Sequence, residues 1–161
     1  MKIAGIVRDS IVDGPGIRDV IFMQGCSHHC KGCHNTQTWN TSGGVERLSG
    51  SILRELSDSQ NDITISGGEP LLQWDALLRL LELIKESTDK RIWLYTGYTV
   101  DLKQQCYHVL ARYVDVIVDG KFIEELKDPN LLFRGSSNQR LVDMKKSVKA
   151  RKIVLWEDNN E

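Results

Sequence analysis

The sequence predicts an α/β fold: an open, incomplete (β/α) barrel of about five or six units. Short apolar runs alternate along the chain with amphipathic segments of helical period, a pattern typical of parallel sheets with right-handed crossovers. The chain has 161 residues, whereas a closed eight-unit barrel needs roughly 250. We therefore expect one domain over residues 1–161, with a polar tail from about residue 157.

Composition narrows the class of protein. Lys+Arg 21 against Asp+Glu 22 leaves no bulk charge that would attract nucleic acid. No apolar run is long enough to suggest a membrane segment, and the N-terminus lacks the apolar region of a signal peptide. Four cysteines without a secretory signal indicate a reducing cytoplasm, where clustered thiols bind metal more often than they form disulfides.

The first half of the chain predicts two strands and a helix. Ile3–Val7 is a short apolar run, and Asp19–Met23 is a second run that leads directly into a loop rich in cysteine. Between them, Asp13-Gly14-Pro15-Gly16 requires a turn. Ser51–Ser57 carries its apolar residues on one face and predicts a short helix.

The second half continues the alternation. We expect further strands at Ile63–Ser66, Ile92–Tyr95, Val114–Val118 and Ile153–Trp156. Amphipathic helices are expected at Trp74–Ser87 and from Asp101 to Tyr113, and the basic run from Lys145 to Lys152 is interpreted as a solvated face.

Polar loops follow the ends of these strands, at the cysteine loop, Gly67–Pro70, Thr96–Gly97 and Asp119–Lys121. In a parallel sheet the carboxyl ends of the strands meet at one edge, which is where such folds keep their active sites. The sequence therefore predicts one functional site at that edge.

Three of the four cysteines, Cys26, Cys30 and Cys33, lie within eight residues in a C-x3-C-x2-C spacing. Three thiolates can hold a cubane iron-sulfur cluster and leave one iron open to a ligand. With His28, His29 or His34 they could instead make a Cys3His zinc site. Cys106 lies on the apolar face of its predicted helix and is interpreted as a core thiol, not a fourth ligand.

Several segments together carry a family resemblance. The cysteine motif followed by Gly67-Gly68-Glu69-Pro70 resembles the radical S-adenosylmethionine superfamily, and Val12–Gly16 with Cys33-His34-Asn35 resembles its activases of glycyl-radical enzymes. Within that group, the chain resembles the activase family of anaerobic, class III ribonucleotide reductases at Tyr95–Tyr98, Val118–Phe122, Leu126–Pro129 and Arg134–Gln139. The likeness runs from about Ile11 to Gln139, and His34 stands where the family often has an aromatic such as Tyr.

The resemblance implies a reaction and partners. A [4Fe-4S] cluster on the three cysteines would bind S-adenosylmethionine at its open iron and reductively cleave it. The 5′-deoxyadenosyl radical would then take a hydrogen from a glycine of the large subunit of the reductase and leave a glycyl radical. A low-potential electron donor such as a flavodoxin is implied, as is a homodimer or a heterotetramer with the reductase.

The cofactor residues follow from the motifs and the resemblance. Gly67 and Gly68 would allow close backbone approach to the methionyl part, and their carbonyls with the Glu69 carboxylate would accept from its ammonium group. Backbone contacts to adenine are implied for Gly32, Cys33 and His34; Lys121 is a candidate for the cofactor carboxylate, and Thr96 and Asp119 for ribose or a cation. The cleft for the glycine loop is expected at Asp13, Gly14, Ser136, Ser137 and Asn138.

Two alternatives remain at this level. A zinc-stabilised binding module of the same fold would use the same cysteines. An activase of another glycyl-radical enzyme, of the pyruvate formate-lyase type, would use the same cofactor chemistry on a different partner.

Overall fold

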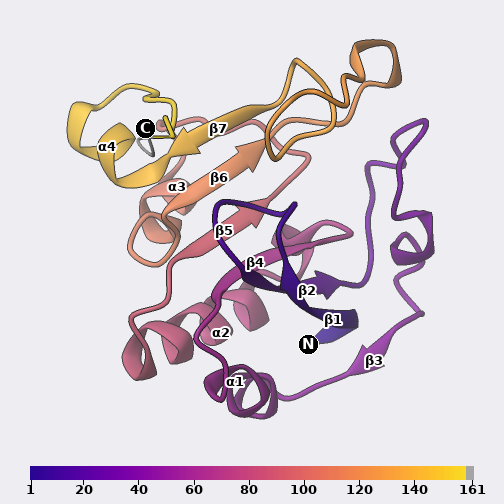
Figure 1. The fold of residues 1–161 in the computed structure, drawn as a ribbon, viewed down its shortest axis with the longest axis vertical. Helices are drawn as coiled ribbons and strands as arrows, with labels where there is room; N and C mark the ends of the chain where they lie inside the picture. The colour runs from indigo at the N-terminus through magenta and orange to yellow at the C-terminus, as the bar shows by residue number, and fades with distance from the viewer. Residues whose placement is uncertain (159–161) are drawn as a thin grey trace.

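The computed structural model describes residues 1–158 and contains one seven-stranded sheet of order β3-β1-β2-β4-β5-β6-β7 (Figure 1). The central strands β2, β4, β5 and β6 are parallel, whereas β1, β3 and β7 pair antiparallel at the two edges. The strands are β1 Lys2–Ser10, β2 Arg18–Met23, β3 Val45–Glu46, β4 Asp62–Gly67, β5 Ile92–Tyr95, β6 Val116–Asp119 and β7 Arg140–Asp143. The helices are α1 Ser49–Ser57, α2 Trp74–Ser87, α3 Gln105–Leu110 and α4 Met144–Ala150.

This architecture confirms the predicted α/β fold with an open sheet. The parallel strands are joined through α1, α2 and α3, so the βα alternation is confined to the centre of the sheet. The helices lie together on the left in Figure 1, while the long loops 24–44 and 120–139 lie on the right, beyond the carboxyl ends of the parallel strands. The predicted functional edge is therefore lined by loops.

Alternate residues of a strand point to opposite sides of the sheet. Consecutive residues of β2, β4, β5 and β6 are buried, so both faces of the central sheet are covered. The main core packs Ile117 of β6 and Val142 of β7 against the helices. On the other face, Trp93, Val116, Val118 and Leu141 form a smaller cluster with Phe133 and Trp156. The ring centres of Trp93 and Trp156 lie 5.0 Å apart in an edge-to-face contact.

Several predicted elements match the structure closely. Helix α2 spans Trp74–Ser87 and β5 spans Ile92–Tyr95, both as expected. The helix expected from Asp101 to Tyr113 is shorter, Gln105–Leu110. The Asp119 carboxylate accepts a hydrogen bond from the Val100 backbone N–H at 2.8 Å, and Gln104, directly before the helix, has an extended backbone.

The strand expected at Ile153–Trp156 is wrong. Only one isolated bridge, between Leu155 and Val142, forms there within residues 1–158. The outer strand is instead β7, whose two buried apolar residues stand between Arg140 and Asp143, and Asp143 then caps α4 by accepting from Lys146 N at 2.9 Å. A run of only two apolar residues is too short to predict a strand from the sequence.

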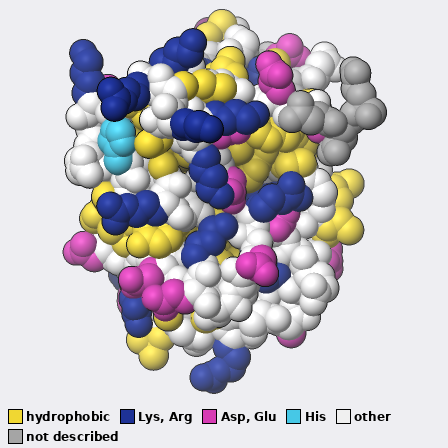
Figure 2. Space-filling model, turned by 90° about the vertical axis from the view of Figure 1, so that its left-hand side faces the viewer, with side chains coloured by type: hydrophobic (Ala, Val, Ile, Leu, Met, Phe, Trp, Pro, Cys, Tyr) yellow, Lys and Arg dark blue, Asp and Glu magenta, His cyan; other side chains and the backbone are white. Residues whose placement is uncertain are grey.

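The basic run lies on α4 and the turn that follows it, on the face shown in Figure 2. Its lysine and arginine side chains are exposed, as expected of a solvated face. Lys145 pairs with Asp115 at 2.8 Å and Lys146 with Asp143 at 3.7 Å. None of the helices within residues 1–158 is both long and apolar enough to cross a membrane. Residues 159–161 of the predicted polar tail lie outside the described residues.

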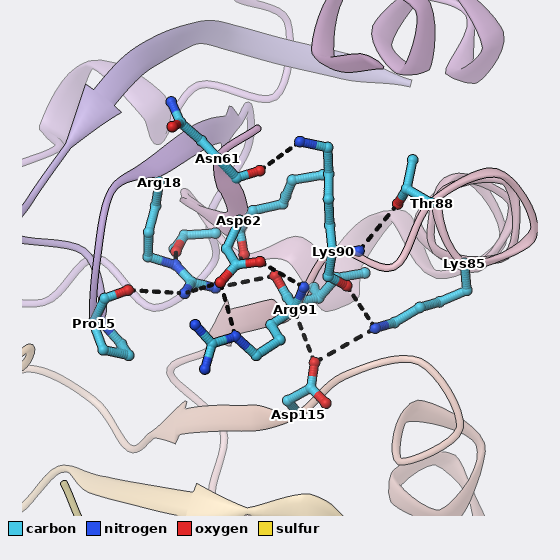
Figure 3. Close-up of polar contacts among 12 residues, drawn as sticks. Pro15, Arg18, Asn61, Asp62, Lys85, Thr88, Lys90, Arg91 and Asp115 are labelled. Atoms are coloured by element: carbon cyan, nitrogen blue, oxygen red, sulfur yellow. Dashed lines mark hydrogen bonds and ion pairs between the residues drawn. The ribbon is translucent and has the colours of Figure 1, made fainter. Parts of the chain in front are cut away.

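Arg18, the first residue of β2, is completely buried at the edge opposite the loops. Its Nε donates to Thr64 Oγ1 and an Nη to the Ile63 carbonyl, each at 2.7 Å, and its guanidinium lies 5.5 Å from the centre of the Trp93 ring. Figure 3 shows Arg18 beside Pro15, whose carbonyl accepts from the other Nη of Arg18 at 3.3 Å. Burial lowers the pKa of Arg18 to about 10, although the nearby Asp62 opposes the shift. The Arg18 side chain therefore links the start of β2 to β4.

The same edge is held by further charged groups (Figure 3). Lys90 donates to two backbone carbonyls between α1 and β4, and Asp115 accepts from Ile92 N at 2.8 Å. Burial alone would raise the pKa of Asp115, but the hydrogen bonds from Lys145 and the Ile92 N–H, with the charges of Lys85 and Lys145, lower it below its usual value. These contacts of Lys90 and Asp115 help to hold the amino ends of the strands in place.

We predict that Arg18→Ala lowers the free energy of unfolding by about 3 kcal/mol, because it removes a buried cation and leaves buried carbonyls without donors. Arg91→Ala is the matched control: its side chain is 66% exposed and its ion pair with Asp62 is a surface one, so the loss should stay below about 1 kcal/mol. Anaerobic urea unfolding followed by far-ultraviolet circular dichroism measures both. Equal losses for the two variants would contradict the role given to Arg18.

Candidate metal centre and cofactor site

The three motif cysteines face one cavity at the carboxyl edge of the sheet. Cys26, Cys30 and Cys33 line it together with Gly67, the last residue of β4, and Gly68, which follows the strand. All three thiols are free and half-buried. Among residues 1–158 no three His, Cys, Asp or Glu side chains are close enough to share a single metal ion.

A cubane cluster makes a different demand from a single ion. Each thiolate binds its own iron, so the sulfurs must surround a cavity and need not converge on one point. Three free thiols lining one cavity, with backbone opposite them, fit that demand. The sulfur donor set is the one that suits iron-sulfur clusters.

The backbone of the cysteine loop is shaped by hydrogen bonds and left-handed residues. Gly25 has φ of 101° and Gly32 of 76°, values that favour glycine. Gly25 N donates to the Thr38 carbonyl at 2.6 Å, which folds the far end of the loop back onto its start. His29, also left-handed with φ of 48°, stacks on Trp39 with ring centres 4.7 Å apart.

The thiol of Cys30 illustrates the electrostatics of the loop. Burial raises the pKa of Cys30, and the neighbouring Cys33 and Cys26 raise it further, while the Phe122 N–H and the charge of Lys121 lower it. The balance is a raised pKa. Positive charge at Lys121 and the N–H of Phe122 are therefore among the groups that favour the thiolate needed for metal binding.

Gly67 and Gly68 are required by close backbone contact with the end of β2. A Cβ atom on Gly67, whose φ is 102°, would lie 2.4 Å from Met23 N, and one on Gly68 would lie 2.2 Å from the Gly25 carbonyl oxygen. Gly68 N donates to Met23 O at 2.9 Å and Glu69 N to Gly25 O at 2.7 Å. The glycine pair thus lets the loop after β4 lie directly against the start of the cysteine loop.

Glu69 is completely buried behind this backbone. Its Oε1 accepts from Leu71 N at 3.0 Å and Thr96 Oγ1 at 2.9 Å, and its Oε2 accepts from Gly97 N at 2.8 Å. Oε2 also lies 2.8 Å from His28 Nε2. The carboxylate therefore joins three loops of the site.

The structure brings part of the predicted cofactor set to the cavity. Cys33, His34, Gly67, Gly68 and Thr96 line it, whereas Gly32, Glu69, Asp119 and Lys121 are not among its lining residues.

Asp119 and Lys121 have other surroundings. Both oxygens of Asp119 pair with Arg140, at 3.0 and 2.6 Å, and its side chain is 1% exposed. Lys121 is exposed, and its backbone carbonyl accepts from Asn138. In the segment between them, Gly120 lines the cavity.

Of the residues expected to form the cleft for the glycine loop, only some line the cavity. Asp13 lines the cavity, whereas Gly14 is buried beside Arg18. Ser136 is buried and donates from its hydroxyl to Asn138 Oδ1 at 2.6 Å, and Ser137 is exposed. Ser136 and Asn138 brace the loop after β6, and their neighbours Gly135 and Gln139 line the cavity in their place.

Sequence reasoning missed some of the lining residues. Tyr95 and Phe122 stand inside segments that carried the family resemblance but were given no role, and His28 was considered only as a zinc ligand. Cys106 lies on α3, where it packs partly buried against the main core and is not among the residues that line the cavity.

Comparison with known proteins gives a consistent picture. A family model described as "4Fe-4S single cluster domain" matches residues 12–142. The chain is 42% identical over 138 residues to the anaerobic ribonucleoside-triphosphate reductase-activating protein of Vibrio cholerae, covering 80% of this chain and 89% of that protein. The protein of the same name from Escherichia coli K12 is 39% identical, with 80% and 90% covered.

A relative from a bacteriophage carries the same name as these bacterial proteins. The anaerobic ribonucleoside-triphosphate reductase-activating protein of Enterobacteria phage T4 is 39% identical over 139 residues, covering 81% of this chain and 86% of its own. The match to a single-cluster iron-sulfur family disfavours the zinc-binding module. The chain belongs to the radical S-adenosylmethionine family of anaerobic ribonucleoside-triphosphate reductase-activating proteins.

Proposed function

We propose that this protein is the activase of an anaerobic ribonucleoside-triphosphate reductase, in which it installs a glycyl radical. The observation that carries the proposal is the cavity shared by Cys26, Cys30 and Cys33 with the Gly67–Gly68 backbone, in a chain of this family. When bound, a [4Fe-4S] cluster and S-adenosylmethionine together supply the one-electron chemistry that makes a carbon radical. The protein holds, orients and shields them.

The cysteine loop would provide the three thiolates and leave the side of the cavity facing the glycine pair for S-adenosylmethionine. Gly67 and Gly68 carry no side chain, so their backbone can approach the ligand closely. Thr96 and His34 line the same cavity and are proposed to contact the cofactor. Asp13, at the cavity and next to the Gly14-Pro15-Gly16 turn, is proposed to face the incoming glycine loop.

Four broader expectations stand as proposals. The electron donor is a low-potential protein such as a flavodoxin, and the activase works as a homodimer or as a heterotetramer with the reductase. The reducing cytoplasm is the proposed location, supported by the four free cysteines. A single domain over residues 1–161 is supported by the one sheet to which all the described strands belong.

We predict that Cys26→Ala, Cys30→Ala and Cys33→Ala each abolish cluster binding and cleavage of S-adenosylmethionine, because a cubane needs its three thiolates. The control is Cys106→Ala, which should keep about four irons per chain and full cleavage. Iron content, visible absorbance and 5′-deoxyadenosine production after anaerobic reconstitution measure the effect. A folded Cys106→Ala without iron, or a motif variant with unchanged cleavage, would contradict the assignment.

The function itself is tested by mixing reduced protein, S-adenosylmethionine and the reductase from the same organism. We expect the doublet signal of a glycyl radical by electron paramagnetic resonance, and no signal when S-adenosylmethionine is omitted or the target glycine is replaced by alanine. A radical formed on a pyruvate formate-lyase type enzyme but not on the reductase would support the alternative activase instead. A colourless protein with stoichiometric zinc would overturn both.

A further inference from the structure

We propose that His28 and Glu69 form a buried clasp that fixes the cysteine loop onto the loops after β4 and β5, and that His28 is thereby a positioning residue for the cluster and its ligand. The inference rests on the proposed function, because it concerns the same cavity. The proposal assigns a role to His28, which lies within the cysteine motif but is not one of its cysteines.

The hydrogen-bond donors around Glu69 fix the direction of the contact. Backbone N–H groups of Leu71 and Gly97 donate to the carboxylate. The Thr96 hydroxyl accepts from Tyr98 N at 3.1 Å, so its own hydrogen points to Glu69. The carboxylate is therefore an acceptor throughout.

With Glu69 as an acceptor, His28 donates from Nε2, at 2.8 Å. The His28 side chain is 7% exposed and that of Glu69 is fully buried. Hydrogen bonds to a charged group in a buried place are among the stronger ones in proteins. Because its two oxygens already accept from these donors, Glu69 acts on the site through its neighbours and not as a direct ligand.

The contact affects the cysteine loop because of where His28 lies in the chain. It stands between Cys26 and Cys30, two residues from each. Glu69 follows β4, and Thr96 with Gly97 follows β5. One carboxylate thus links the loop that carries the thiols to the two neighbouring strand ends, and losing the link frees two of the three thiols to move.

The space for the His28 ring is provided by Gly97. A Cβ atom on Gly97 would lie 2.4 Å from His28 Cδ2 and 2.6 Å from Nε2, so a methyl group there must displace the ring. Gly97 is not among the glycines with positive φ, and alanine is therefore compatible with its backbone. The His28 ring also meets the Tyr98 ring edge-on, with centres 4.6 Å apart.

The test compares His28→Ala, His28→Gln and Gly97→Ala in the full chain, with His108→Ala as the control. His108 is a half-buried histidine on α3 that bonds to the Leu102 carbonyl and does not line this cavity. Glutamine can place an amide N–H near the position of Nε2. Hydrogen exchange of the amides of residues 26–34 is measured with and without the cluster, and S-adenosylmethionine affinity by calorimetry on the cluster-loaded protein.

We expect His28→Ala and Gly97→Ala to speed exchange in residues 26–34 and to weaken S-adenosylmethionine binding, each by at least about tenfold, as the loss of one buried charged hydrogen bond predicts. His28→Gln should recover most of both, and His108→Ala should change neither.

Wild-type exchange and affinity in His28→Ala, or in Gly97→Ala if His28→Ala does not fold, would overturn the clasp. So would a His28→Gln variant no better than His28→Ala. Exchange without the cluster tests the clasp even if the wild-type protein fails to bind S-adenosylmethionine, an outcome that would instead refute the proposed function.

Discussion

The site depends on the backbone contact between the end of β2 and the end of β4. Gly67 and Gly68 lie so close to Met23 and Gly25 that no side chain fits between them. The N–H groups of Gly68 and Glu69 donate across this gap, so the loop that carries the cysteines begins at a position set by the loop that faces them. If these loops separated, the three thiols would still be present in the sequence, but the cavity that they share with the glycine backbone would be lost.

The amino ends and the carboxyl ends of the strands differ in structure. At the amino ends of the strands, Arg18, Lys90 and Asp115 are buried or half-buried and their polar atoms are satisfied by neighbouring backbone and side chains. At the carboxyl ends, backbone is exposed to a cavity, and glycines with positive φ replace side-chain packing. A sheet held firmly at one edge can present irregular loops at the other, which is the usual division in α/β proteins.

Much of this was predictable from the sequence, and the failures have physical causes. Helix α2 and strand β5 were predicted with the bounds observed, because the apolar residues of α2 repeat at helical spacing and β5 is an unbroken apolar run. The cysteine and glycine motifs predicted residues that the structure places around one cavity, because close backbone approach restricts the residues allowed there. Strand β7 was missed since only Leu141 and Val142 are buried in it. The pairing of Asp119 with Arg140 could not be predicted, because it joins distant segments through side chains without periodicity.

The central claim is that three cysteines hold a four-iron cluster whose remaining iron receives S-adenosylmethionine. Mössbauer spectroscopy of protein reconstituted with iron-57 tests this most directly, because a site with a different ligand set gives its own signal. The account predicts that about one iron in four changes its isomer shift when S-adenosylmethionine is added, and that this change is absent without the cofactor. Four irons that remain equivalent and unaffected by S-adenosylmethionine would contradict it.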